Sequence, residues 1–257
     1  MRPVFTASQT SIRLSGKPIS GADDRQRKIP GFSQEVFSSS RVVLVGAGGI
    51  ASPIALTLVR KGIGGISLLD SDIVEASNLN RQRFFEKDIG ENKAVALAGN
   101  LAPECIAATD IQGTPLRFEE AVAVGTDLSC DVAVCGVDNN PARVATSRYF
   151  RKLGVPVIFA AVSRDGDHGY VFVQEKNGAC IGCLFPDMAD DDRYPCPGTP
   201  AIADILQAVG SLAIYAIDTL LMQRQRDWNY RRISLSGGNF DGATRMQERP
   251  GCPMCSD

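Results

Sequence analysis

The stretch Val42-Val-Leu-Val-Gly46-Ala-Gly48-Gly49-Ile-Ala51 decides the fold of this chain. An apolar run leads directly into a Gly-x-Gly-x-x-Ala sequence, which is typical of a buried parallel strand, a tight turn and a helix. Glycine suits this turn because its backbone angles exclude most side chains and because a phosphate must approach the main chain closely. The N-terminus of the next helix offers unpaired N–H groups to an anion. The stretch therefore predicts that Gly46, Gly48 and Gly49 bind the phosphates of a nucleotide.

The residues that follow extend this unit into a sheet. Residues 50–61 have helical spacing, the glycines of 62–65 end that helix, and residues 66–69 form a second apolar strand. Asp70 closes this strand at the distance where an acidic residue meets ribose hydroxyls. Further strands are expected at 130–136 and 155–162, with a helix between them. This order predicts an α/β fold of the Rossmann type, doubly wound around a mostly parallel sheet.

The rest of the chain suggests one domain with three parts. Residues 1–24 are polar, and we expect an arm or loop without its own core. Residues 25–175 are the predicted nucleotide-binding core, with an edge strand at 110–113 and an antiparallel strand at 168–174. Residues 176–257 are the predicted C-terminal lobe, with a crossover loop, a long apolar helix at 202–221 and a short strand at 233–235.

Composition narrows the class of protein. The chain has 257 residues, 44% of them hydrophobic and 22% charged, which is ordinary for a globular enzyme. A net charge of −2 argues against a broad electrostatic grip on nucleic acid. The N-terminus lacks the apolar core of a signal peptide, and no apolar run has the length of a membrane span. We therefore expect a cytoplasmic protein without a nucleic-acid or membrane partner.

Charged residues near the glycine turn distinguish between ATP and NAD. Arg81 and Lys93 follow the acidic end of the second strand, and Asp138 follows a later strand. These positions meet at one edge of a parallel sheet, because ligands bind at the carboxyl ends of its strands. Arg and Lys hold a triphosphate and spread the charge of leaving pyrophosphate, while a carboxylate holds Mg²⁺. A nicotinamide needs few charges nearby, so the pattern favours MgATP.

These motifs, in this order and spacing, resemble the ThiF/MoeB/HesA family, the bacterial relatives of ubiquitin-activating enzymes. The resemblance covers roughly residues 25–255. The segments that carry it are Gly46-x-Gly48-Gly49, Leu68-Leu-Asp70-x-Asp72, Ser77-Asn78-Leu-Asn-Arg81-Gln82, Gly90-x-x-Lys93, Val137-Asp138-Asn139 and, upstream, Arg25-Gln26 with Pro30-Gly31-Phe32.

The resemblance implies a role for each matching residue. The three glycines would face the phosphates, Asp70 would bind the ribose, and Asp138 would bind Mg²⁺. Arg25 would reach into the active site of the partner subunit, because family members are usually homodimers. The remaining residues implied in nucleotide binding are Asn78, Arg81, Lys93 and Asn139.

The implied reaction is adenylation. A carboxylate attacks the α-phosphorus of ATP, pyrophosphate leaves, and an acyl-adenylate forms. Since a carboxylate is already ionised at neutral pH, no general base is needed. The expected substrate is the C-terminal glycine of a small ubiquitin-like or sulfur-carrier protein, with a conjugating or sulfur-transfer protein downstream. Alternatives in the same fold are a dehydratase acting on threonylcarbamoyladenosine in tRNA and a peptide-adenylating enzyme of antibiotic synthesis. A catalytically inactive scaffold subunit is an alternative of another class.

Two Cys-x-x-Cys pairs point to a structural metal. Cys180 and Cys183 form one pair, and Cys252 and Cys255 form the other, about seventy residues later. Four thiolates suit a closed, tetrahedral zinc site, which would pin the C-terminus to the domain.

Cys196 is a separate prediction. It lies in a proline-rich stretch ahead of the long apolar helix. This stretch resembles the mobile loop that, in thiamin-pathway members of the family, carries a cysteine able to bond covalently to the carrier protein. An exposed thiol there could attack the adenylate.

Overall fold

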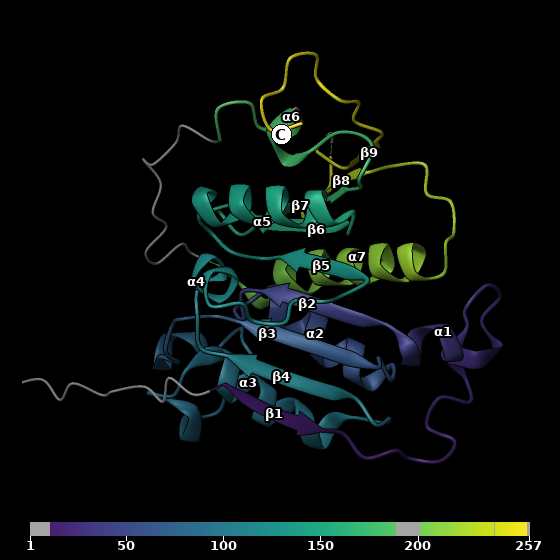
Figure 1. Cartoon of the computed structure of the whole chain (residues 1–257), viewed down its shortest axis with the longest axis vertical. Coiled ribbons are helices and arrows are strands. Elements are labelled where there is room, and N and C mark those ends of the chain that lie inside the picture. Colours follow the sequence, from purple (N-terminus) through teal and green to yellow (C-terminus); the bar gives the residue numbers. More distant parts are fainter. Residues whose placement is uncertain (1–10, 189–200, 239, 256–257) are drawn as a thin grey trace, which may run out of the picture.

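A single sheet flanked by helices forms the frame of the protein in this computed structural model, which describes residues 11–188, 201–238 and 240–255. The sheet has nine strands in the order β1-β4-β3-β2-β5-β6-β7-β8-β9, and Figure 1 shows them from the bottom of the view to the top. The strands are β1 (Ile12–Ser15), β2 (Arg41–Val45), β3 (Gly65–Leu69), β4 (Asp110–Thr114), β5 (Val132–Cys135), β6 (Val157–Val162), β7 (His168–Gln174), β8 (Tyr230–Ser234) and β9 (Gly242–Thr244).

The central strands confirm the doubly wound, mostly parallel sheet. β2 pairs in parallel with β3 on one side and with β5 on the other, and β4 and β6 continue the parallel pairing outward. The chain therefore builds outward from β2 through β3 to β4, and then returns to the other side of β2. The point where this direction reverses leaves a crevice at the carboxyl ends of the strands.

Helices cover both faces of the sheet. The alternation of side chains along β2 shows why, since Val42 and Leu44 belong to one buried cluster while Val43 and Val45 belong to the other. The first cluster includes residues of α2, α3 and α7, and the second includes residues of α4, α5 and α6. The helices are α1 (Gln34–Ser39), α2 (Ala51–Arg60), α3 (Lys93–Leu101), α4 (Phe118–Ala123), α5 (Asn140–Leu153), α6 (Ile181–Leu184) and α7 (Ala203–Leu221), with short 3-10 turns η1 (Gln26–Lys28), η2 (Ala76–Asn78), η3 (Glu86–Asp88) and η4 (Ala102–Glu104).

Within the described part of the chain, α7 is the one helix whose length and apolar composition would allow it to cross a membrane. Half of that apolar window is buried inside the protein. Its residues Ile205, Val209 and Ala213 lie fully inside the first cluster. α7 packs against α2, β6 and β7, which is the position of a core helix.

The N-terminal residues differ from the expected coreless arm. Residues 12–15 form β1, which pairs antiparallel with β4, and Ile12 and Leu14 pack against the core. Arg13 adds two hydrogen bonds to the Asp110 carboxylate, at 2.7 and 2.8 Å. β4, which we expected at the sheet edge, is therefore covered by β1. A four-residue strand gives too short an alternation to be recognised within a polar segment.

The C-terminal part continues the same sheet. β7, β8 and β9 pair antiparallel with their neighbours beyond β6, as the sequence indicated for residues 168–174. β8 begins three residues earlier than the predicted strand at 233–235, and β9 was not predicted. The nucleotide-binding core and the C-terminal lobe are thus joined by continuous strand pairing, while their exact boundary stays a prediction.

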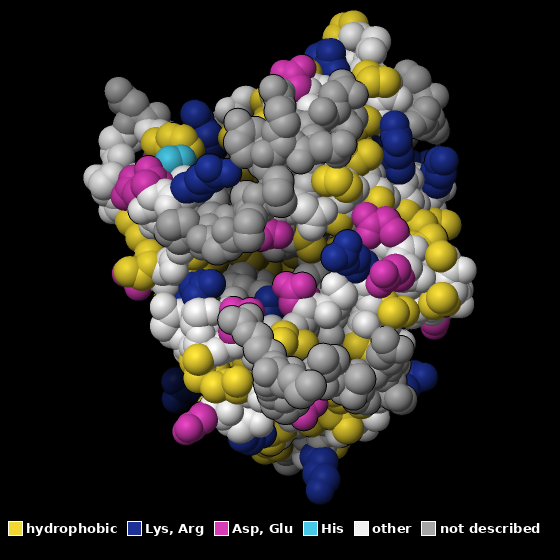
Figure 2. Space-filling view, turned by 90° about the vertical axis from the view of Figure 1, so that its left-hand side faces the viewer, with side chains coloured by type: hydrophobic (Ala, Val, Ile, Leu, Met, Phe, Trp, Pro, Cys, Tyr) yellow, Lys and Arg dark blue, Asp and Glu magenta, His cyan; other side chains and the backbone are white. Residues whose placement is uncertain are grey.

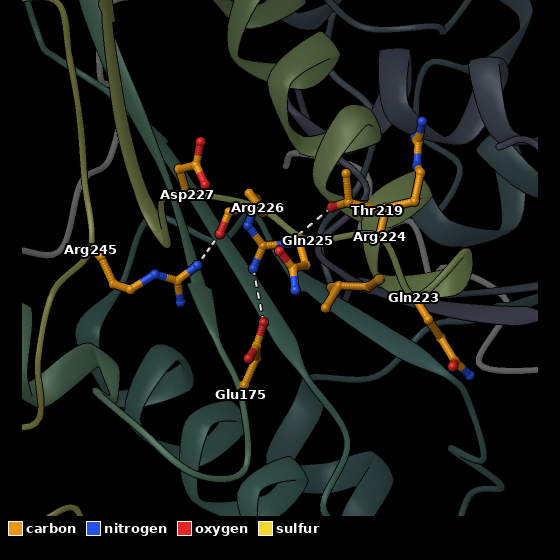
Figure 3. Close-up of a pocket in the computed structure, with 9 residues that line it drawn as sticks. Glu175, Thr219, Gln223, Arg224, Gln225, Arg226, Asp227 and Arg245 are labelled. Carbon is orange, nitrogen blue, oxygen red and sulfur yellow. Dashed lines mark hydrogen bonds and ion pairs between the residues drawn. The ribbon is translucent and has the colours of Figure 1, made fainter. Parts of the chain in front are cut away.

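Arg226 anchors the loop after α7, beside a small cavity of about 640 Å³. Its side chain is only 4% exposed. Figure 3 shows it between Thr219 and Glu175, to which it donates hydrogen bonds of 2.9 Å each, with Arg245 donating to its main-chain oxygen. Arg224 points away from this group (Figure 3). Because one arginine thus joins α7, the residue after β7 and the residue after β9, we interpret this cavity as a structural junction.

Candidate active site

An open cleft of about 1880 Å³ lies at the point where the strand order reverses. It is lined by the residues that follow β2, β3, β5 and β6. Figure 2 shows the face of the molecule at this end of the strands, which is hollowed at its centre and has Lys, Arg, Asp and Glu side chains around the hollow. The predicted site residues that line this cleft are Gly46, Gly48, Gly49, Asp70, Asn78, Arg81, Lys93, Asp138 and Asn139.

The glycine turn has a separate steric reason at each position. Gly46 has a φ of +99°, which L side chains rarely adopt. A Cβ on Gly49 would lie 2.8 Å from a methyl carbon of Leu206, so this glycine lets α7 pack against the turn. A Cβ on Gly48 would meet no atom closer than 4.0 Å, so this position is open. α2 then begins without a side-chain cap. Of its first three residues only Ala51 has an N–H left for another acceptor, because the Ser52 N–H donates to the Gly48 main-chain oxygen at 2.9 Å and Pro53 has no N–H.

Asp70 fixes the turn in the described structure. One carboxylate oxygen accepts a hydrogen bond from the Ala47 N–H, and the other accepts one from the Asp72 N–H, both at 2.8 Å. Burial raises the pKa of Asp70, whereas the charge of Lys93 and these N–H groups lower it. The carboxylate also lines the cleft. Its contact with a ribose stays a prediction, and its hold on the glycine turn is a second role that the sequence did not indicate.

The loop that carries Asn78 and Arg81 is stabilised by its own polar contacts. The Asn78 side-chain oxygen accepts a hydrogen bond from the Glu75 N–H at 3.0 Å. Nη1 of Arg81 donates to the Ser77 main-chain oxygen at 2.6 Å and to the Asn80 side chain at 2.9 Å. Both residues line the cleft, so these bonds orient them toward it while leaving other donors of the guanidinium for a ligand.

Gln82 supplies an observation that the sequence could not. Its Oε1 atom is buried and has no hydrogen-bond partner in the described structure. This atom is also the nearest neighbour of the open side of Gly48. A buried acceptor without a donor is costly, so its presence in a cleft points to a ligand with a polar hydrogen or a bound water.

Asp138 and Asn139 stand at the end of β5 in different roles. Asp138 is exposed and lines the cleft. The Asn139 side-chain oxygen accepts a hydrogen bond from the Ala142 N–H at 2.9 Å and so caps α5. Arg143, which we did not predict, also lines the cleft and donates to the Val137 main-chain oxygen at 3.1 Å. The sequence signal that could have identified Arg143 was its position in the first turns of the helix that follows Asp138.

Apolar and aromatic side chains also line the cleft. They include Tyr170, Leu184, Phe185 and Leu206. Burial raises the pKa of Tyr170 to about 12, so its phenol is protonated at neutral pH and does not act as a base. The single histidine of the chain, His168, is not among the lining residues.

One predicted site residue, Arg25, does not join the cleft of its own chain. Arg25 is exposed next to η1, and the neighbouring Gln26 donates to the main-chain oxygen of Lys61, the residue just after α2. Since the start of α2 lies at the glycine turn, its end lies at the opposite edge of the sheet. Cys196 lies outside the described residues.

The four predicted metal ligands lie together. The Sγ atoms of Cys180, Cys183, Cys252 and Cys255 are all within 4.8 Å of one another. Neighbouring pairs are 3.3 to 3.8 Å apart. A tetrahedral zinc ion with Zn–S bonds of about 2.3 Å requires sulfur separations of roughly 3.8 Å. The cluster therefore has the ligand type, number and spacing that fit structural zinc.

Comparison with known proteins assigns the chain. A model of the ThiF family matches residues 23–254. The chain belongs to the ThiF family. The resemblance inferred from the glycine turn and its charged neighbours is thus confirmed.

Members of this family with assigned roles are moderately similar in sequence. The SAMP-activating enzyme E1 of Haloferax volcanii is 28% identical over 85% of this chain and 81% of its own length. The sulfur carrier protein adenylyltransferase of Thermus thermophilus is 29% identical over 87% of this chain and 85% of its own. The mouse adenylyltransferase and sulfurtransferase MOCS3 is 30% identical over 85% of this chain and 48% of its own.

Solved structures support the fold. E. coli MccB in complex with ATP superposes with a TM-score of 0.69 at 20% identity, over 86% of this chain and 68% of that one. PaaA superposes with a TM-score of 0.67 at 19% identity, over 91% of this chain and 76% of that one. At these identities the likeness confirms the fold alone.

Proposed function

We propose that this protein adenylates the C-terminal glycine carboxylate of a small ubiquitin-like or sulfur-carrier protein, with MgATP as the second substrate. The observation that carries the proposal is the convergence of the glycine turn, Arg81, Lys93 and Asp138 on one cleft at the strand-reversal point. The named functions of the Haloferax and Thermus relatives favour adenylation of a protein carrier.

The chemistry follows from what these residues can do. The phosphates of ATP would lie against the open side of Gly48 and the uncapped start of α2. The carboxylate of the carrier attacks the α-phosphorus, the bond from the α-phosphorus to the bridging oxygen breaks, and pyrophosphate takes up the negative charge. Arg81 and Lys93 stabilise that charge. No histidine lies among the described lining residues, and a nucleophile that is already ionised needs no general base.

Mg²⁺ fits the oxygen donors on the cleft wall. Asp138 is exposed at the end of β5 and supplies the hard oxygen ligand that Mg²⁺ prefers. When bound, the ion would neutralise phosphate charge. Asn139 would support it indirectly, because its cap on α5 holds the backbone next to Asp138.

Peptide adenylation remains the second candidate. The specific observation that favours it is the structural likeness to MccB, which has been solved with ATP and with the peptide MccA. The sequence relatives named for protein carriers are more similar, at 28 to 30% identity. We therefore place the protein carrier first.

Arg25 and the zinc site complete the proposal. Arg25 would act in the cleft of a second copy, because within its own chain it stands at the opposite edge of the sheet. In a homodimer, mixing Arg25→Ala chains with Asp138→Ala chains would then restore part of the activity. The cluster of four cysteines would hold one structural Zn²⁺ per chain.

Cys196 is proposed as the nucleophile of a second step. Its thiolate would attack the acyl carbon of the adenylate, AMP would leave, and a thioester with the carrier would form. A thiol-sensitive adduct that is present in the native chain and lost in Cys196→Ala would support this step, and its presence in both would exclude it.

Pyrophosphate exchange tests the proposed function. Labelled pyrophosphate should enter ATP only when a carrier protein ending in Gly-Gly is added, and Asp138→Ala should abolish the exchange. Exchange that is supported by tRNA or by a short peptide, but not by any carrier protein, would contradict the protein-carrier proposal. Glu91→Gln is the control, because Glu91 is an exposed acid on a neighbouring loop that does not line the cleft.

A further inference from the structure

Hydrogen bonds tie the main chain of Asp72 to the end of β3 and to the start of α3. Its N–H donates to Asp70, and its main-chain oxygen accepts from the Lys93 N–H at 2.8 Å and from the Asn92 side chain at 3.1 Å. Asn92 also donates to the main-chain oxygen of Asp70 and caps α3 through Val95. These bonds join the end of β3 to the start of α3 and so fix the position of the Asp72 backbone that carries the carboxylate.

The Asp72 carboxylate is paired with Lys93. Its Oδ2 lies 2.9 Å from Lys93 Nζ. The Lys93 side chain is only 13% exposed, whereas the Asp72 side chain is 66% exposed. Lys93 is thus turned into the cleft wall and retained there by a carboxylate that itself faces solvent. Both residues line the cleft in which the phosphates of ATP would lie.

We propose that Asp72 is a positioning residue that holds Lys93 while no phosphate is bound and takes it back when pyrophosphate leaves. This rests on the proposed function, in which Lys93 binds phosphate. The Lys93 ammonium cannot give its full charge to Asp72 and to a phosphate at once, so Asp72 competes with ATP and with pyrophosphate. The competition weakens ground-state binding and makes release of pyrophosphate faster.

The size of the effect follows from the exposure of the pair. An ion pair with one solvent-exposed partner contributes about 0.2 to 1 kcal/mol, which corresponds to a factor of about 1.4 to 5 in affinity. Replacing Asp72 by Asn keeps the shape and removes the charge. Asp72→Asn should therefore bind both ATP and pyrophosphate about 1.4- to 5-fold more tightly, whereas damage to the loop would weaken both.

Calorimetric titration tests the inference. ATP and pyrophosphate are each titrated into the full chain, once with Mg²⁺ and once with a chelator, for native protein, Asp72→Asn and the control Glu91→Gln. Glu91 is an exposed acid next to Asn92 that does not line the cleft, so its replacement reports the general effect of one lost negative charge. A Lys93→Met background shows whether the effect passes through Lys93.

We expect Asp72→Asn to bind ATP and pyrophosphate more tightly than native protein, and Glu91→Gln to bind them with unchanged affinity. In the Lys93→Met chain, adding Asp72→Asn should not change the affinity. Unchanged or weaker binding in Asp72→Asn overturns the inference, and weakening only in the presence of Mg²⁺ would assign Asp72 to the metal instead. If native protein binds neither ATP nor pyrophosphate, the proposed function fails and the inference falls with it. If native protein binds both, a missing effect of Asp72→Asn overturns the inference alone.

Discussion

At the scale of single residues, the glycine turn shows which roles a sequence can reveal. Its pattern identified the turn and its acidic neighbour, because these residues are close along the chain. The reason for Gly46 is its positive φ, whereas the reason for Gly49 depends on Leu206, which is far away in sequence. The same holds for the buried oxygen of Gln82 and for the Lys93–Asp72 pair. Contacts of this kind arise only when distant segments meet.

Alanine at Gly48 and at Gly49 should have opposite effects. A Cβ at Gly48 enters open space, so Gly48→Ala should leave the melting temperature unchanged and weaken ATP binding at least tenfold by crowding the phosphates. A Cβ at Gly49 would press on Leu206 at 2.8 Å, so Gly49→Ala should cost about 1 to 3 kcal/mol of stability. Thermal melting and ATP titration of the two variants check this. A loss of stability in Gly48→Ala with unchanged ATP binding would contradict the assigned position of the phosphates.

Arg83 is a matched control for the proposed binding of phosphate by Arg81. Arg81 lines the cleft, and Arg83, two residues along, does not. Arg81→Ala should lower kcat/KM for adenylation by about 10² to 10³, the usual effect of losing one donor to a developing charge. Arg83→Ala should leave it within a factor of two or so, as expected of an ordinary surface change. Steady-state kinetics would refute the assignment by showing equal losses in both variants.

At the scale of secondary-structure elements, long apolar strands were predicted and short edge elements were not. The helix at 202–221 and the strand at 168–174 were located closely because their apolar patterns are long. β1 and β9 have four and three residues, and their stability comes from pairing with neighbours rather than from local pattern. β1 is held by pairing with β4, by two apolar side chains and by Arg13.

The contact between β1 and β4 should be sensitive to pH. Hydrogen bonding to the Arg13 side chain holds the pKa of Asp110 below its usual value, with Arg41 acting in the same direction. A lowered folded-state pKa means that the stabilisation is present above the unfolded pKa of about 3.9 and is lost as pH falls through the folded value. Since the Arg13 side chain is 72% exposed, Asp110→Asn should cost at most about 1 kcal/mol at pH 7. Denaturant unfolding of both chains should show this difference shrink as the pH is lowered below 4 or so; a constant difference would contradict the ion-pair explanation.

At the scale of the whole molecule, the cysteine cluster connects parts of the chain that are far apart in sequence. Cys180 and Cys183 belong to or adjoin α6, and Cys252 and Cys255 lie at the end of the described chain. The two pairs were predicted to meet because spaced thiols in such a protein point to zinc. The structure brings the two pairs together, while zinc binding stays a prediction. The strand β1 within residues 1–24 shows that a polar composition can hide a short strand.

Removing zinc should destabilise the packing of the C-terminal residues rather than the cleft. We expect about one zinc atom per chain, and Cys252→Ala or prolonged chelation should lower stability by several kcal/mol, because the metal closes a long loop. Cys130→Ala is the control, since Cys130 lies outside the cluster. Metal analysis combined with thermal melting checks this. Full zinc content in Cys252→Ala, or an equal loss of stability in Cys130→Ala, would exclude the four-cysteine site.

The position of the label in ATP tests the central claim most directly. In the proposed reaction a carboxylate attacks the α-phosphorus in the cleft lined by Gly48, Arg81, Lys93 and Asp138. With ATP labelled at the α-phosphate and a carrier protein ending in Gly-Gly, the label should travel with the carrier as a hydroxylamine-sensitive adduct. With ATP labelled at the γ-phosphate, the carrier should stay unlabelled and the label should appear in pyrophosphate. Transfer of the γ-label to the carrier, or no labelled carrier from either ATP in the Cys196→Ala chain, in which that thiol cannot displace AMP, would contradict the account.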